Sequence, residues 1–215
     1  FIDDLVTYGL ERENITYIPN VVATTNFYPK EIAAGHPLRE KFKAKADTFN
    51  VLGVGQVQTR KGVLDFIEIA KSMPDVNFIW AGGFQLEAAM KNPPDNVHFI
   101  GIIDRDEMND LYNMVDCLLM TSYNELFPMA ILEAINAGLP LVLRDIELYE
   151  KLYFTDYLRA RNHEEFEKLL CSLRDDDDVR KKAIEASKKI ASDYSEEHVA
   201  KLWIDYYRRI VEKWS

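Results

Sequence analysis

From residue 49 onward, short apolar runs alternate with helical patterns along most of the chain. The apolar runs occupy residues 49–54, 76–81, 97–100, 115–120 and 139–143. Stretches with helical spacing separate them, at residues 62–72, 85–90, 106–114 and 128–137. A short run that is apolar throughout is typical of a strand covered on both faces, and its alternation with helices is typical of βαβ units. The pattern therefore predicts an α/β fold with a Rossmann-like, doubly wound parallel sheet.

Both ends of the chain depart from this alternation. Residues 1–10 have the pattern of a helix that ends near Gly9, and residues 15–18 that of a short strand. After the sheet the pattern predicts extra C-terminal helices, at residues 163–171, 179–193 and 195–214. The acidic run at residues 175–178 is interpreted as a solvated loop between two of these helices.

Composition and charge limit the classes of function. The chain has 215 residues, 47% of them hydrophobic, and a formal net charge of −10. A nucleic-acid-binding protein needs a basic face to neutralise phosphates, so we expect no nucleic-acid partner. The charge also disfavours laying the whole surface on an anionic membrane, although a small basic patch can still do so locally. No run approaches the roughly 18 apolar residues of a membrane span.

Cysteines and histidines give no sign of a metal centre. The two cysteines, Cys117 and Cys171, are too few for a disulfide scaffold or a zinc site. Cys117 lies in an apolar run and is predicted to be a buried thiol, which fits a reducing, cytoplasmic setting. The histidines are scattered without metal-ligand spacing, and His98 is interpreted as a packed or surface residue.

The loop after the first main strand carries glycines and two adjacent cations. Gly53 and Gly55 allow close backbone approach, but Gln58 stands where a dinucleotide fingerprint needs its third glycine. Arg60 and Lys61 precede the next helix, where two cations can clamp a diphosphate. The alternative is an ordinary solvated basic pair.

Two glutamates surround the start of a helix after the fourth main strand. Pro128 suits the first turn of that helix, whose free N–H groups and positive end favour a phosphate. Glu125 precedes the helix, and Glu133 lies inside it among apolar neighbours. A carboxylate in so apolar a stretch needs a partner, which ribose hydroxyls would supply. The alternative partner for Glu133 is a local arginine, lysine or backbone N–H.

These residues resemble a known family. Glu125 and Glu133, with seven residues between them, resemble the E-x7-E motif of family-4 retaining glycosyltransferases. Further matches follow in the family's order: Ile18-Pro19-Asn20 with Phe27-Tyr28-Pro29, Lys61-Gly62, Asn96-Val97 to Gly101, Leu111-Tyr112 before Asp116, and Gly138-Leu139-Pro140. The resemblance covers nearly the whole chain.

The resemblance implies half of a GT-B enzyme, which has two Rossmann-like domains with the active site between them. Residues 1–47 would then be a linker from an N-terminal domain outside this chain. Residues 48–195 would form the C-terminal, nucleotide-sugar-binding domain. Residues 196–215 would form a helix that crosses back to the N-terminal domain.

The family's roles carry over to matching positions of this chain. The resemblance implies that Glu133 binds the ribose hydroxyls and that Glu125 contacts the transferred sugar. Backbone N–H groups of Leu126 and Phe127 would face the sugar and the diphosphate. Lys61 would hold the diphosphate and stabilise the leaving group, with no metal and no cofactor required. Main-chain groups near Ile102 and Ile103 would meet the base.

The chain departs from the family's pattern in the loops. Gln56 stands after Gly55 where the family has an arginine, so we expect Arg60 to supply the charge at this substrate-binding loop. Leu126 and Pro128 replace glycines, and Pro128 offers no N–H. Residues 144–149 replace a glycine-rich loop. For Arg144 in that segment, the simplest interpretation is an ion pair with Asp145 or Glu147.

The function expected from the resemblance is transfer of a hexose, from UDP-glucose or UDP-galactose, to an acceptor hydroxyl with retention. The sequence of residues 124–134 and 141–149 is similar to that of Gram-positive glycosyltransferases that glycosylate diacylglycerol lipids. The acceptor sugar or lipid would bind through the N-terminal domain, with peripheral contact at the inner face of the membrane, so the chain alone is expected to be inactive. The alternatives are a non-catalytic glycosyltransferase-like subunit that stabilises a partner enzyme, and a sugar-nucleotide epimerase of related fold.

Overall fold

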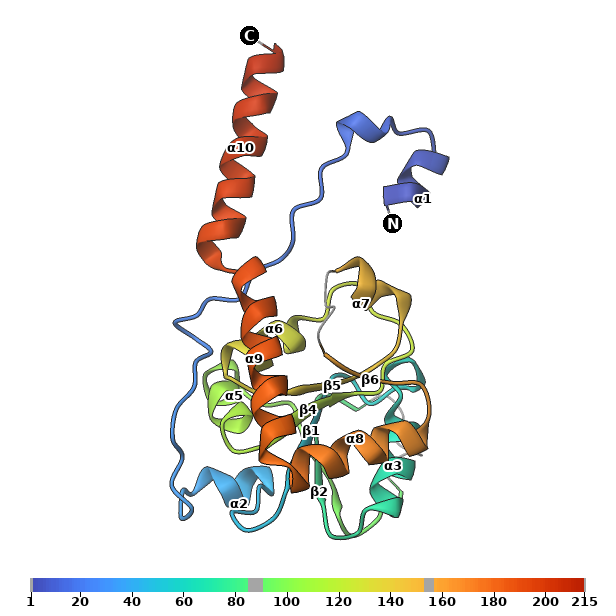
Figure 1. Cartoon of the computed structure of the whole chain (residues 1–215), viewed down its shortest axis with the longest axis vertical. Coiled ribbons are helices and arrows are strands. Elements are labelled where there is room, and N and C mark those ends of the chain that lie inside the picture. The colour runs from blue at the N-terminus through green and yellow to red at the C-terminus, as the bar shows by residue number, and fades with distance from the viewer. Residues whose placement is uncertain (1, 85–90, 153–156, 215) are drawn as a thin grey trace.

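A single parallel sheet organises the chain in the computed structural model, which describes residues 2–84, 91–152 and 157–214. Within these residues the sheet has six strands in the order β3-β2-β1-β4-β5-β6 (Figure 1). The strands are β1 Asn50–Val54, β2 Asn77–Ala81, β3 Val97–Gly101, β4 Cys117–Met120, β5 Leu141–Arg144 and β6 Leu158–Ala160. All five pairings are parallel. The predicted Rossmann-like, doubly wound sheet is confirmed.

The strand predictions fail at two places. β6 was not predicted because its three residues include Arg159 and make no apolar run. It pairs only with β5, at the edge of the sheet, where one polar side chain is tolerated. The strand predicted at residues 15–18 is wrong. This segment follows a short 3₁₀ turn at Arg12–Asn14 and has no neighbouring strand among the described residues. An extended segment without a partner forms no ladder.

Helices cover both faces of the sheet. The longer ones are α3 Val63–Ser72, α5 Arg105–Tyr112, α6 Met129–Asn136, α8 His163–Asp175, α9 Asp177–Asp193 and α10 Glu196–Trp214. The shorter ones are α1 Ile2–Thr7, α2 Leu38–Phe42, α7 Glu147–Lys151 and a 3₁₀ turn, η2, at Thr59–Lys61. The helix predicted at residues 85–90 lies outside the described residues. No helix of the described part is long and apolar enough to cross a bilayer.

The acidic run at residues 175–178 is exposed as predicted, but it is not a loop. Asp175 ends α8, and the Asp176 side chain accepts hydrogen bonds from the backbone N–H groups of Asp178 (2.9 Å) and Val179 (3.1 Å). Aspartate is a favourable N-cap and stabilises the first turn of a helix. The run therefore joins two helices through a single capping residue.

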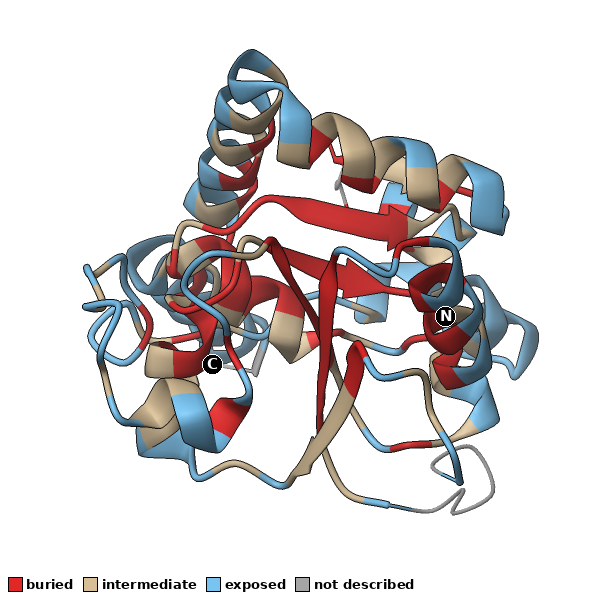
Figure 2. Ribbon diagram, turned by 90° about the horizontal axis from the view of Figure 1, so that it is seen from below, coloured by how far each residue is buried: buried red, intermediate tan, exposed pale blue. Residues whose placement is uncertain are grey.

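Two apolar layers hold the sheet between the helices. Alternate residues of β1 point to opposite faces, so Leu52 joins the layer under α5 and α6, and Val51 the layer under α3 and α8. The central strands β1, β2 and β4 are buried along almost their whole length (Figure 2). Cys117 is fully buried in the second layer, as predicted, and burial raises the pKa of its thiol.

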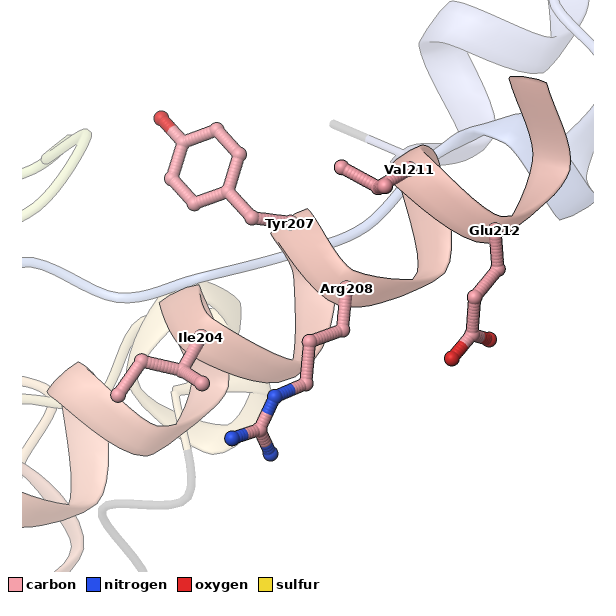
Figure 3. Close-up of a pocket in the computed structure, with 5 residues that line it drawn as sticks. All are labelled: Ile204, Tyr207, Arg208, Val211 and Glu212. Carbon is pink, nitrogen blue, oxygen red and sulfur yellow. The ribbon is translucent and has the colours of Figure 1, made fainter. Parts of the chain in front are cut away.

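The last helix, α10, extends beyond the body of the fold and lies beside the N-terminal segment (Figure 1). Arg209 donates a hydrogen bond to Thr16 Oγ1 (2.7 Å), and Lys213 donates one to Asn14 Oδ1 (3.0 Å). Another face of the helix carries Tyr207 and Val211, which are 59% and 63% exposed. Figure 3 shows this face together with the side chains that lie beside them. A large part of the apolar surface of α10 is thus open to solvent.

Candidate functional site

The candidate site lies where β1 and β4 end side by side. The strand order reverses between these two strands, and ligands of open parallel sheets bind outside the carboxyl ends at such a point. The loops that follow touch each other: the Tyr123 N–H donates to the Arg60 carbonyl (2.9 Å) and Thr121 Oγ1 donates to the Gly62 carbonyl (2.8 Å). Gly62 has φ of +70°, and a Cβ there would lie 2.0 Å from the Thr121 carbonyl oxygen. Only glycine permits this approach.

Lys61 and Glu125 form an ion pair across these loops. Lys61 Nζ lies 2.6 Å from Glu125 Oε1, and the two side chains are only 16% and 5% exposed. Arg60 adds a second cation, 3.8 Å from Glu125 Oε2, and donates to the Asn124 carbonyl (2.7 Å). Removing one partner of a buried pair costs roughly 3–5 kcal/mol, so the burial of Glu125 depends on Lys61. Lys61 is therefore not the solvated cation of the simpler interpretation, whereas Arg60 stays half exposed.

Lys61 also covers the glycine at the end of β1. Gly55 has φ of +144°, and a Cβ there would lie 3.2 Å from Lys61 Cε. Gly82, after β2, lies still closer to Gly55, because a Cβ added to Gly82 would lie 1.9 Å from the Gly55 carbonyl oxygen. Gly53 has a different role from the one the sequence suggested. Its space is filled by the ring of Trp80, 2.6 Å from an added Cβ, so it serves packing within the sheet.

Glu133 on α6 faces a tyrosine rather than a charge. The Tyr112 hydroxyl donates to Glu133 Oε2 (2.8 Å), and the Tyr112 side chain is fully buried. The pKa of Glu133 is raised, chiefly by burial, although the Tyr112 hydrogen bond and the charge of Arg105 oppose this. None of the alternative partners expected for Glu133 is found among the described residues. Its second oxygen, Oε1, accepts no hydrogen bond within that part of the chain.

The segment between the two glutamates leads into α6. Leu126 is 86% exposed, whereas the Phe127 ring packs edge-on against Tyr194 with centroids 5.8 Å apart. Pro128 is the N-cap, and its carbonyl accepts from the Ile131 N–H (3.0 Å). The helix thus begins one residue later than predicted. Its free N–H groups open beside the loop that carries Glu125.

The loops after β2 and β3 complete the same edge. The Gly82 N–H donates to the Gly101 carbonyl (2.7 Å), and the Ile102 side chain lies 3.5 Å from where a Cβ on Gly83 would be. Ile102 is 83% exposed, while Ile103 packs partly against the core. Gln56 is exposed at the end of β1. The structure therefore brings the predicted residues to one edge of the sheet, and their ligand contacts stay predictions.

Arg144 belongs to a partly buried network that the sequence did not reveal. Its Nη2 bonds Asp65 on α3, its Nε donates to the Thr121 carbonyl (2.8 Å), and its guanidinium lies 4.1 Å from the centre of the Tyr123 ring. The predicted ion pair with Asp145 or Glu147 is wrong. Asp145 turns instead to Arg161 (3.0 Å), because Arg144 leaves the end of β5 toward α3.

Asp65 collects several donors in that network. His163 Nε2 lies 2.8 Å from its Oδ1, and the Tyr123 hydroxyl bonds it as well. Burial opposes the ionisation of Asp65, but the Tyr123 and His163 hydrogen bonds and the Arg144 charge outweigh it, so the Asp65 pKa is lowered. The sequence did contain one indication of the position of Arg144. This residue directly follows an apolar run, which brings its guanidinium to the carboxyl edge of the sheet.

Metal ligands do not gather at this edge. Across residues 2–84, 91–152 and 157–214 there is no group of three or more histidine, cysteine, aspartate or glutamate side chains arranged to hold an ion. The ends of β1 and β4 bring together the charges of Arg60, Lys61 and Glu125, with the Arg144–Asp65 pair beside them.

Comparison with known proteins agrees with this geometry. The family model described as glycosyl transferases group 1 matches residues 36–190. An alpha-galactosylglucosyldiacylglycerol synthase of Streptococcus pneumoniae is 39% identical over 97% of this chain. A processive diacylglycerol alpha-glucosyltransferase of Acholeplasma laidlawii is 31% identical over 81% of it. The chain covers 59% and 54% of the lengths of these two relatives.

Solved structures agree on the fold. The crystal structure of Anabaena Alr3699/HepE in complex with UDP and glucose superimposes with a TM-score of 0.81, at 18% identity, over 98% of this chain and 60% of the other. With the matched domain, the close relatives and the observed sheet, the chain belongs to the group 1 glycosyl transferases and has the Rossmann-like C-terminal half of their GT-B fold.

Proposed function

We propose that this chain is the nucleotide-sugar-binding part of a retaining hexosyltransferase. The observation that carries the proposal is the Lys61–Glu125 ion pair, held at the switch point of the sheet beside the start of α6. A nucleoside diphosphate needs cations and N–H donors around its phosphates, and a sugar needs acceptors for the hydrogen bonds of its hydroxyl groups. This edge supplies both kinds of group within a few ångströms.

The diphosphate is held by Lys61, with Arg60 next to it. One donor of Lys61 Nζ is occupied by Glu125, which leaves the other hydrogens of the ammonium group for phosphate oxygens. The N–H groups at the start of α6 add a partial positive charge. In the reaction the bond between the anomeric carbon and the diphosphate breaks, and the acceptor oxygen bonds that carbon on the same face. The departing diphosphate takes the bonding electron pair, and its new charge is stabilised by these groups. The proton that the acceptor hydroxyl loses passes to an oxygen of the departing diphosphate.

The nucleoside and the sugar are held by carboxylates. Glu133 Oε1 accepts hydrogen bonds from the ribose hydroxyls, while Tyr112 fixes the other oxygen. Glu125, oriented by Lys61, accepts hydrogen bonds from the transferred sugar. The backbone of Leu126 and Phe127 adds N–H donors, and the segment at Ile102 and Ile103 meets the base. Gly55 and Gln56 line the loop beneath the diphosphate.

The relatives support a lipid acceptor. One is named an alpha-galactosylglucosyldiacylglycerol synthase and the other a processive diacylglycerol alpha-glucosyltransferase, so both names contain a diacylglycerol lipid and the alpha configuration. We therefore propose UDP-glucose or UDP-galactose as donor, a diacylglycerol glycolipid as acceptor, and a location in the cytoplasm at the inner face of the membrane. No observation favours a non-catalytic subunit or an epimerase.

We further propose that the first part of the linker at residues 1–47, together with residues 196–215, packs against an additional domain that supplies the acceptor site. The later part of the linker packs on the Rossmann-like domain of this chain, because Val22, Phe27 and Phe42 are buried in the layer under α5 and α6. The relatives are longer than this chain, and α10 leaves Tyr207 and Val211 exposed on an apolar face (Figure 3). In the longer protein we expect the amide hydrogens of α10 to exchange more slowly than in this chain alone, while those of α9 do not change. Mass spectrometry measures both, and equal rates for α10 would contradict the packing.

Calorimetry with uridine diphosphate tests the site in this chain alone. We expect weak binding, with a Kd of about 1 mM or below, because the second domain makes no contribution. Glu133→Ala should abolish the binding, since the ribose loses its acceptor. Glu185→Ala, an exposed carboxylate on α9, is the matched control and should bind as the parent does. A folded sample that gives no heat at millimolar ligand would count heavily against the site, and unchanged affinity in Glu133→Ala would refute the ribose assignment.

The raised pKa of Glu133 predicts a cost to stability. Between the unfolded value near 4.5 and the higher folded value, the folded chain keeps a proton that the unfolded chain has lost. The contribution of Glu133 to stability therefore falls as pH rises through that window. Glu133→Gln keeps an acceptor for Tyr112, so we expect it to be more stable than the parent at about pH 7.5 and to lose this advantage below about pH 4. Urea unfolding at both pH values measures the difference, and an advantage that is independent of pH would contradict the assignment.

Product analysis with the full-length protein tests the reaction. We expect labelled UDP-glucose or UDP-galactose to yield an alpha-linked glycosyl diacylglycerol. Lys61→Ala should lower kcat by about 100-fold or more, because the departing diphosphate loses its main cation. Lys71→Ala, an exposed lysine on α3 paired with Glu68, should not change it. Transfer to no lipid or soluble acceptor, by a folded and pure protein, would sink the proposal.

A further inference from the structure

A basic hollow lies at the edge of the sheet opposite the candidate site, where the strands begin. It is a shallow pocket of about 270 Å³. The residues that line it are Ala34, Arg39, Glu40, Lys43, Ala44, Lys45, Ala46 and His98. Lys43 and Lys45 precede β1 and His98 lies at the start of β3, whereas Lys61 follows β1. The hollow is therefore separated from the donor site by the length of the strands.

Buried asparagines fix the backbone that carries the two lysines. Asn77 Nδ2 donates to the Lys43 carbonyl (2.8 Å), and the Lys45 N–H donates to Asn50 Oδ1 (2.9 Å). Asn50 Nδ2 in turn donates to the Lys45 carbonyl (2.7 Å). Lys43 ends α2 in the left-handed region, with φ of +59°. Both lysines thus leave a rigid piece of main chain on the same side of the molecule.

The cations of this hollow lack carboxylate partners. Arg39, Lys43 and Lys45 form no ion pair within the described residues, although the protein as a whole carries a charge of −10. Lys41, on the same helix but outside the hollow, is paired with Glu107 at 2.5 Å. Arg39 is held in place by hydrogen bonds to the carbonyls of Ala33 (3.2 Å) and Ile32 (3.4 Å). Glu40 is the single acidic residue in the lining.

His98 adds a polar atom without a partner. Its Nε2 is buried and makes no hydrogen bond within the described part of the chain. Burial lowers the pKa of His98, and the charges of Lys45 and Lys43 lower it further. Three cations and an imidazole therefore surround a space that contains one carboxylate. The chemistry that completes such a site is an anion with several acceptor oxygens.

We propose that this hollow binds a phosphate group, carried either by a free phosphate compound or by the headgroup of an anionic lipid. Lysine and arginine are the side chains that bind phosphate oxygens most strongly, and the pocket is large enough for one phosphate and a small substituent. The site works independently of the donor site. If the phosphate belongs to a lipid, the amino edge of the sheet faces the membrane.

Proton NMR of the His98 imidazole, titrated with inorganic phosphate in saturating uridine diphosphate, tests the proposal. Bound phosphate stabilises the imidazolium, so we expect the His98 pKa to rise as phosphate is added. The double variant Lys43→Gln/Lys45→Gln should weaken phosphate binding by about tenfold or more, because two charge-assisted hydrogen bonds are lost. Lys41→Gln removes a lysine of the same helix outside the hollow and should bind as the parent does. Glu40→Gln should bind more tightly, by about twofold or more.

Vesicles distinguish the two sources of phosphate. In one outcome, phosphatidylglycerol vesicles bind the chain through Lys43 and Lys45, and phosphatidylcholine vesicles do not. In the other, free phosphate binds and neither kind of vesicle does. The first result assigns the site to a lipid headgroup and the second to a soluble phosphate compound. A His98 signal that ignores phosphate, or a folded Lys43→Gln/Lys45→Gln variant that binds as tightly as Lys41→Gln, would overturn the proposal.

Discussion

The contact between Gly62 and Thr121 is the constraint on which the candidate site depends. The Thr121 carbonyl oxygen occupies the place of a side chain on Gly62, so the loops after β1 and β4 lie in direct contact. This contact brings Lys61 to Glu125 although 64 residues separate them along the chain. A side chain on Gly62 would push the loops apart, and the carboxylate of Glu125 would lose the cation that compensates for its burial.

A second set of interactions keeps this edge rigid. Arg144 reaches from β5 to the Thr121 carbonyl and to Asp65 on α3, and Asp65 also bonds His163 and Tyr123. Loops that bind ligands are usually mobile, but here partly buried charges join three elements beside Glu125. Rigid support of this kind lets a site hold its groups in position before the ligand arrives.

The two glutamates are buried in different ways, and this sets their chemistry. Glu125 has cations on both oxygens, so its charge is balanced before any ligand binds. Glu133 accepts a hydrogen bond from the neutral hydroxyl of Tyr112, and its burial raises its pKa against the opposing charge of Arg105. Retaining such a carboxylate opposes stability and is understandable where a ligand supplies further donors.

The sequence predicted the local elements better than the partners between them. Apolar runs located β1 to β5 because helices cover the sheet on both faces, but β6 is too short and too polar for this signal. The rule that parallel strands share a carboxyl edge predicted that Lys61 and Glu125 belong together. Nothing in the spacing pointed to Tyr112 for Glu133 or to Asp65 for Arg144, because those contacts depend on how α5 and α3 pack on the sheet. The linker and the crossing of the C-terminal helix stay predictions.

A crystal structure of this chain with uridine diphosphate tests the central claim most directly. We predict that a phosphate oxygen lies within hydrogen-bond distance of Lys61 Nζ, about 2.7–3.2 Å, and that the ribose hydroxyls donate to Glu133. Tyr112 should keep its bond to the same carboxylate. A nucleotide bound elsewhere, or one that leaves both Lys61 and Glu133 without a new contact, would contradict the donor site proposed at Lys61 and Glu133.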